Sequence, residues 1–153
     1  MIDDLYSAKV LRLAAVTPRL GRLADAHASS EKVSKLCGSR VTVDVKVDGD
    51  TVVDFAQDVK ACALGQAAAS VLGEHVMGAS LAEIEAARDG LRAMLKAGGP
   101  PPAGRFADLA LLEAVKDYPA RHTSTMLAFE AAAEAVRTAV ERNADAGLHL
   151  PDA

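Results

Sequence analysis

Two cysteines, Cys37 and Cys62, are the side chains in this 153-residue sequence best suited to chemistry. A lone cysteine in an alanine-rich chain is usually a small buried hydrophobe. Cys37, however, is followed by Gly38 and Ser39 in a polar stretch that does not resemble core sequence. Cys62 directly precedes an apolar helical pattern, and the N-terminus of a helix favours the thiolate form of cysteine. Both positions therefore indicate functional thiols rather than packing residues.

The segment between the cysteines predicts a β-hairpin. Valines alternate with polar residues along its first strand, which indicates an antiparallel sheet with one buried face: Val41, Val43, Val45 and Val47. Asp48-Gly49 predicts the turn. The returning strand is expected to continue the buried face with Val53, Phe55 and Val59. Because a hairpin brings the chain back to the end that it left, both thiols should lie at one end of the sheet.

Helical patterns surround this hairpin. Apolar residues recur at helical spacing in residues 3–16, 62–78, 80–98, 106–119 and 120–142, and Ser80 and Glu83 form a capping box. Asp3 and Asp4 suit the start of the first helix. Residues 18–27 are expected to form a turn or a short helical continuation, 28–39 a polar loop, and 143–153 a frayed tail. The pattern predicts an α+β fold, a small antiparallel sheet with helices on one face, in a single domain of residues 1–153.

Composition and motifs argue against several functions. A net charge of −4 without a Lys/Arg run argues against binding nucleic acid, and no apolar run reaches the ~20 residues of a membrane helix. With no signal-peptide core, the two cysteines are expected to be reduced in the cytoplasm. The sequence has neither a nucleotide-binding glycine motif nor a serine nucleophile elbow. The aspartates of the hairpin are interpreted as a solvated face: Asp44, Asp48 and Asp50. Three histidines are interpreted as isolated residues and not as metal ligands: His27, His75 and His149.

Four segments in order resemble the IscU/NifU-like iron–sulfur cluster assembly scaffold family. "PRLG" after the first helix is similar to that family's "PRNxG" region, and "LCGSR" stands where it has a Cys-Gly-Asp loop. "QDVKACALGQAAAS" resembles its second cysteine segment, and "YPARHTSTMLAF" resembles its third. The long stretch between Met94 and Tyr118 is typical of the SufU-like branch. The resemblance covers nearly the whole chain.

The resemblance implies a SufE/NifU-like fold with a three-stranded sheet. In that family, three cysteines and an aspartate at one end of the sheet hold a nascent [2Fe–2S] cluster or a zinc ion. A cysteine desulfurase supplies the sulfur, so the chain is expected to act as a scaffold and not as an enzyme. Thiolates suit both metals, because iron and zinc favour sulfur ligands.

This sequence departs from the family pattern at two of the four ligand positions. Cys37 and Cys62 match the first two cysteines, whereas Ser39 stands at the aspartate position and Ser124 at the third cysteine. The glycines before the second cysteine are also replaced, by Val59 and Ala61.

Three interpretations of the smaller ligand set follow. The chain could hold metal with both cysteines, water and a substitute ligand such as His122, or two chains could pool their thiols in a homodimer. It could also have lost metal and act as a protein-binding or regulatory module. His122 is expected on the surface beside Arg121, although extended backbone at residues 120–123 would turn it toward Ser124.

Overall fold

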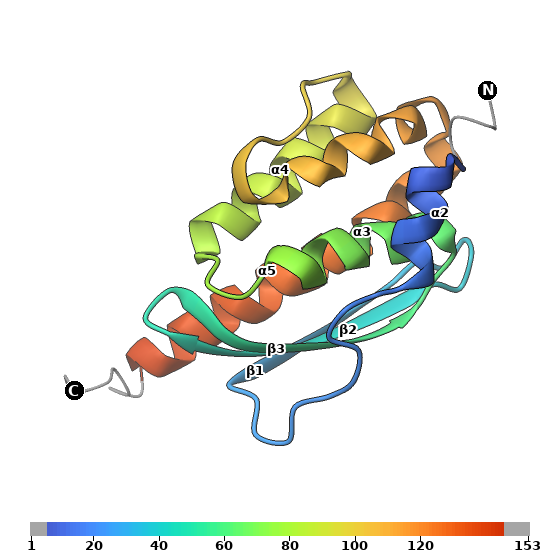
Figure 1. Ribbon diagram of the computed structural model, residues 1–153. Coiled ribbons are helices and arrows are strands. Elements are labelled where there is room, and N and C mark those ends of the chain that lie inside the picture. The colour runs from blue at the N-terminus through green and yellow to red at the C-terminus, as the bar shows by residue number, and fades with distance from the viewer. Residues whose placement is uncertain (1–5, 146–153) are drawn as a thin grey trace.

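The three strands of the fold form one antiparallel sheet, as the resemblance implied. The computed structural model describes residues 6–145. The strands are β1 (Ala28–Val33), β2 (Arg40–Asp48) and β3 (Thr51–Lys60), in the order β1-β2-β3. Figure 1 shows that the helices lie together on one face of this sheet. The predicted α+β class, with helices on one face of a small sheet, is confirmed.

The helices form two layers above the sheet. The α3 helix (Ala63–His75) and the long α5 helix (His122–Asp145) pack on the strands and on each other. Above them lie α2 (Ala8–Ala15), α4 (Leu81–Ala97) and the 3₁₀ helix η1 (Gly104–Asp117), which a short 3₁₀ turn, η2 (Pro119–Arg121), connects to α5. None of the helices in residues 6–145 is long and apolar enough to cross a bilayer.

The predicted hairpin is confirmed, with one correction to its second strand. All four alternating valines of β2 are buried against the helices. On β3, however, the register shifts opposite Lys46 and Val47, so that Val52 is buried and Val53 is 47% exposed. A β-bulge inserts one extra residue and therefore reverses the alternation, which period-two reasoning cannot anticipate. Phe55 is buried as expected.

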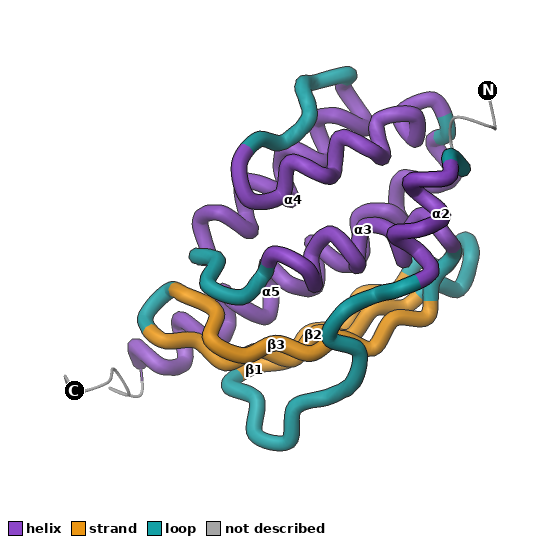
Figure 2. Tube along the Cα trace, in the orientation of Figure 1, coloured by secondary structure: helices purple, strands orange, loops and turns teal. Residues whose placement is uncertain are grey.

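The outer face of the sheet is partly covered by the segment between α2 and β1, which crosses beneath the strands (Figure 2). This segment is irregular rather than a helical continuation, and Leu20 forms a parallel bridge to Gln57 at the edge of β3. Asp44, expected on a solvated face, is only 1% exposed. Its carboxylate accepts hydrogen bonds from the Arg22 guanidinium at 2.7 Å and from the Leu23 N–H at 2.9 Å. A buried carboxylate therefore anchors this crossing segment.

Replacing Asp44 with asparagine is expected to destabilise the fold by about 1–3 kcal/mol, because Arg22 would lose its charged partner. Burial opposes ionisation of Asp44, but hydrogen bonds from Arg22, Ser29 and the Leu23 N–H outweigh it, and the pKa is lowered. A lowered folded-state pKa stabilises the fold above the ordinary carboxyl pKa, and this stability is lost as the pH falls through the folded-state value.

Urea unfolding at several pH values would measure this effect. The wild-type protein should lose its advantage over Asp44→Asn on acidification. The control is Asp54→Asn on β3, since the Asp54 side chain is 42% exposed and lies 3.9 Å from Arg19. Equal stability of both variants at neutral pH would show that Asp44 anchors nothing.

The prediction of a polar loop over residues 28–39 is wrong in its first half, where β1 forms. Ser30 is buried and its hydroxyl donates to Glu134 on α5, while Lys32 forms an ion pair with Glu134 at 3.2 Å. The strand is an edge strand with polar side chains, a common way to limit edge-to-edge aggregation. Its hydrophobic alternation is consequently too weak to read from the sequence.

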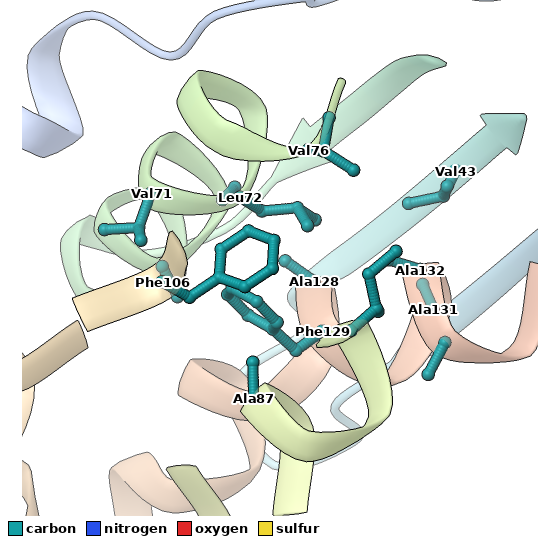
Figure 3. Close-up of a cluster of buried hydrophobic side chains, with 14 of the residues drawn as sticks. Val43, Val71, Leu72, Val76, Ala87, Phe106, Ala128, Phe129, Ala131 and Ala132 are labelled. Atoms are coloured by element: carbon teal, nitrogen blue, oxygen red, sulfur yellow. The ribbon is translucent and has the colours of Figure 1, made fainter. Parts of the chain in front are cut away.

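The apolar faces of the helices meet in one core. The Ser80–Glu83 capping box is present, and α4 ends at Gly98, whose φ of +67° is readily adopted by glycine. Phe106 of η1 packs edge-to-face on Phe129 of α5, with ring centroids 5.2 Å apart (Figure 3).

The predicted frayed tail begins too early. The α5 helix continues through Asp145, so the prediction is wrong for residues 143–145. Residues 146–153, and Asp3 and Asp4 at the other end of the chain, lie outside the described residues.

Candidate thiol site

The loop that carries Cys37 is closed by its own backbone. The Ser34 N–H donates to the Ser39 carbonyl at 2.8 Å, and the Gly38 N–H donates to the Ser34 carbonyl at 2.8 Å. Gly38 has a φ of +74°, which a residue with a side chain rarely adopts. Ser34 and Ser39 are buried, whereas Cys37 is exposed at the tip. The loop thus presents a thiol over two buried hydroxyls.

Both hydroxyls contact the Cys37 sulfur. The Ser39 Oγ lies 3.0 Å from the Sγ atom and the Ser34 Oγ lies 3.5 Å from it. Sequence reasoning identified Ser39 but missed Ser34. The available signal was its position three residues before the cysteine in a short polar loop.

Cys62 occupies the N-cap position of α3, as the sequence predicted. Its half-buried Sγ lies 3.6 Å from the Oγ of Ser124, in the first turn of α5. The Ser124 hydroxyl also lies within hydrogen-bonding distance of the Arg121 carbonyl, at 3.2 Å. Gly65 allows this approach, because a Cβ there would meet the Ser124 carbonyl oxygen at 3.0 Å. The two helix starts therefore meet directly beneath Cys62.

Strand pairing brings the Cys37 loop to the same place. Arg40, which follows the loop, is paired with Lys60, which precedes Cys62. The Ser124 hydroxyl also makes a small contribution to lowering the pKa of the Cys37 thiol. The loop between β1 and β2 and the starts of α3 and α5 lie at the end of the sheet opposite the hairpin turn (Figure 1). Four of the positions that the sequence singled out, Cys37, Ser39, Cys62 and Ser124, are thus brought together.

Hydrogen bonding makes the Cys37 thiol acidic. The hydrogen bond with Ser34 contributes most and the one with Ser39 next, and together they outweigh the opposing effect of burial, lowering the pKa from 9.0 to about 7. The backbone of Ser39 and the Ser124 hydroxyl contribute in the same direction. A carboxylate beside the sulfur would oppose ionisation through like-charge repulsion. The serine at position 39 therefore favours the thiolate where the family's aspartate would disfavour it.

His122 does not lie on the surface as predicted. Its side chain is buried, and its Nε2 lies 2.9 Å from the Val115 carbonyl oxygen and 3.2 Å from that of Lys116, at the end of η1. The backbone at His122 is already helical, with φ −62° and ψ −48°, so the extended alternative is wrong as well. Two residues along a helix turn the side chain by about 200°, away from the direction of Ser124. The imidazole holds η1 against α5.

Three hydroxyls, those of Ser34, Ser39 and Ser124, contact the sulfurs of the two cysteines. Within residues 6–145, no three His, Cys, Asp or Glu side chains gather closely enough to hold a metal ion. Serine is a poor ligand, since its hydroxyl stays protonated near neutral pH, and here the hydroxyls hydrogen-bond to the sulfurs. A [2Fe–2S] cluster takes four thiolates or close substitutes. One chain therefore does not fit a complete cluster site.

Comparison with known proteins shows which family this chain belongs to. The model of the NifU-like N terminal domain family matches residues 5–142. The chain belongs to this family. A nitrogen-fixing NifU-like protein (N-terminal) from Brucella abortus has 50% sequence identity and a TM-score of 0.89, with 92% of this chain and 97% of that chain covered. The resemblance found in the sequence is thereby confirmed.

Two further relatives give the family its biochemical setting. The iron–sulfur cluster assembly scaffold protein IscU of Thermotoga maritima is 29% identical over 133 residues, which are 87% of this chain and 93% of that protein. A SUF-system scaffold-like structure from Fervidobacterium islandicum AW-1 has 24% identity and a TM-score of 0.79, over 88% of this chain and 98% of that chain. The latter supports the fold alone. The family is one of iron–sulfur cluster assembly scaffolds, which generally are not enzymes.

Proposed function

We propose that this chain acts in iron–sulfur cluster assembly as a two-thiol scaffold, whose iron or zinc cargo is bound only when donors from outside the chain complete the ligand set. The observation that supports this most directly is that strand pairing brings Cys37 and Cys62 to the same end of the sheet, where the Ser124 hydroxyl contacts the Cys62 sulfur and helps to lower the pKa of the Cys37 thiol. Packing does not explain Cys37, because its side chain is exposed.

A second copy of the chain is the simplest source of the missing donors. Two chains would supply four thiols, the number that a [2Fe–2S] cluster or a structural zinc ion takes. The Cys37 loop is exposed and can approach a partner, whereas Ser39 and Ser124 are buried beside the sulfurs. In this proposal the cysteines hold the cargo in a homodimer, and the serines stabilise thiolates without ligating. A cysteine desulfurase is the expected sulfur-donating partner, in the cytoplasm.

Metal content of anaerobically purified protein tests the proposal, before and after reconstitution with iron and sulfide. We expect about one cluster or zinc ion per two chains, and its loss together with the dimer in Cys37→Ala/Cys62→Ala. His75→Gln is the control, because this half-exposed histidine lies at the other end of α3 and pairs with Asp108. Metal that persists without both cysteines, or that depends on His75, would contradict a thiol site.

The second candidate is a protein-binding or regulatory module that no longer holds metal. The small donor set in the described residues favours it. It predicts that neither preparation contains thiol-dependent metal, whereas binding to a cysteine desulfurase, measured by calorimetry, survives the double cysteine substitution. The two candidates therefore differ in both measurements.

A further inference from the structure

An open groove of about 520 Å³ lies beside Cys37, and the cluster chemistry discussed above does not account for it. The Cys37 loop lines one side, with Leu36 adding apolar surface, and residues 117–121 line the other. Leu36 is 74% exposed although it is large and apolar. The volume lies within the 300–1,000 Å³ that small-molecule sites commonly span.

The groove carries one acidic and one basic side chain for which residues 6–145 supply no ion-pair partner. Asp117 and Arg121 both line it, four positions apart, as the last residues of η1 and η2. Within residues 6–145 neither forms an ion pair, whereas Arg92 and Arg137 on the α4–α5 surface pair with carboxylates. The groove therefore combines an accessible thiol, an apolar wall, and a carboxylate and a guanidinium that no other described residue pairs with.

This set of groups matches a small zwitterionic thiol. An α-ammonium group would pair with Asp117, an α-carboxylate would accept hydrogen bonds from the planar guanidinium of Arg121, and a short apolar stem would contact the wall. Cysteine itself, or a peptide thiol with both charges, has these features and carries its sulfur one carbon from the charged centre. Charge complementarity thus selects the ligand class.

We propose that this groove is a recognition site for low-molecular-weight zwitterionic thiols, and that Cys37 forms mixed disulfides with their disulfides. In the reaction, the Cys37 thiolate attacks one sulfur of a disulfide such as cystine, and a bond forms between the two sulfurs. The disulfide bond of the reagent breaks, and its second half leaves as a thiolate that takes up a proton. Two electrons stay in the departing thiol, so no further oxidant enters.

The groove chemistry goes beyond the proposed scaffold role and requires no metal. A mixed disulfide at Cys37 would occupy one of the two thiols of the chain and leave Cys62 alone. Asp117 and Arg121 would be specificity-determining residues, because they contact the reagent and not the sulfur of Cys37.

Exchange rates with three disulfides of different charge test the proposal. Cystine carries both charges, cystamine only ammonium groups, and 3,3′-dithiodipropionate only carboxylates. The metal-free Cys62→Ala protein has Cys37 as its single thiol, and intact-mass spectrometry follows the adduct. Each rate is divided by that of N-acetylcysteine with the same disulfide. We expect this ratio to be about 3- to 10-fold higher for cystine than for either other reagent, as two partly exposed ion pairs allow.

Two charge-neutral variants should change the preference in opposite ways. Arg121→Gln should slow cystine and dithiodipropionate but not cystamine, and Asp117→Asn should slow cystine and cystamine but not dithiodipropionate. Unfolding cannot produce this crossed pattern. Arg137→Gln, on the α4–α5 surface, should leave all three ratios unchanged. Equal ratios for the three reagents, or variants that slow all of them alike, would overturn the proposal.

Discussion

Ser124→Cys is expected to convert the two-thiol site into a three-thiol site with much tighter metal binding. The Ser124 Oγ lies 3.6 Å from the Cys62 sulfur and helps to lower the pKa of the Cys37 thiol, so a sulfur there would lie near both thiols. Four-ligand zinc sites in small peptides bind with about 10–16 kcal/mol, roughly 3 kcal/mol per ligand, so one added thiolate should raise zinc affinity about 100-fold. Competition with a chromophoric chelator measures this change.

Thr123→Cys is the matched control for that substitution. It adds the same thiol to the same helical turn, but position 123 is exposed whereas Ser124 is 1% exposed. The helix turns the neighbouring side chain by about 100°, so this thiol should point away from Cys62 and add little affinity. Similar gains in zinc affinity in both variants would mean that a third thiol in this turn raises the affinity wherever it is placed. No gain with Ser124→Cys would show that the site cannot assemble around a metal ion.

The sequence predicts the fold correctly where the local residue pattern and the burial of the side chains agree. The four valines of β2, the Ser80–Glu83 capping box and the N-cap position of Cys62 all follow from short-range rules, and the structure has them as expected. The convergence of the two thiols also followed, because a hairpin fixes where its ends meet. These features follow from local patterns and from the closure of a single hairpin.

The errors in the fold arise where distant contacts decide a local property. Asp44 looked solvated because it alternates with buried valines, but the segment carrying Arg22 crosses the outer face and covers it. Residues 28–33 looked like a loop because Ser30 is polar, yet its partner is Glu134, 104 positions away. Val53 is exposed because a bulge shifts the register. None of these partners can be inferred from the neighbouring sequence.

At the candidate site, too, the sequence predicts the positions of the residues, whereas their contacts are known only from the structure. Sequence comparison located Cys37, Ser39, Cys62 and Ser124, but it could say only that two ligands had been replaced. The geometry adds that the replacements hydrogen-bond to the remaining sulfurs, and that Ser34 joins them. His122, the attractive substitute ligand, is bonded to the end of η1 instead. The serines at the positions where the resemblance implies metal ligands are therefore also groups that lower the pKa of the Cys37 thiol.

This activation predicts that metal-free protein reacts with iodoacetamide at unusually low pH through Cys37. With a pKa of about 7 the alkylation rate should rise to half its plateau near that pH, instead of near the ordinary thiol value of 9.0. At pH 6, such a thiol is about 100-fold more ionised than an ordinary one. Its thiolate is about tenfold less nucleophilic, so the alkylation rate should be about tenfold higher than that of an ordinary thiol. Peptide mapping separates the alkylation of Cys37 from that of Cys62.

Removing the hydroxyl donors should reverse the effect. Ser34→Ala and Ser39→Ala each take away a hydrogen bond that stabilises the thiolate, so the pKa of Cys37 should rise and the midpoint should move toward alkaline pH. Ser34→Ala should have the larger effect, because its hydroxyl contributes most. Ser80→Ala, which removes a serine cap at the hairpin end of the sheet, should leave the midpoint unchanged. A wild-type midpoint near 9 would mean that the buried serines pack the loop without activating its thiol.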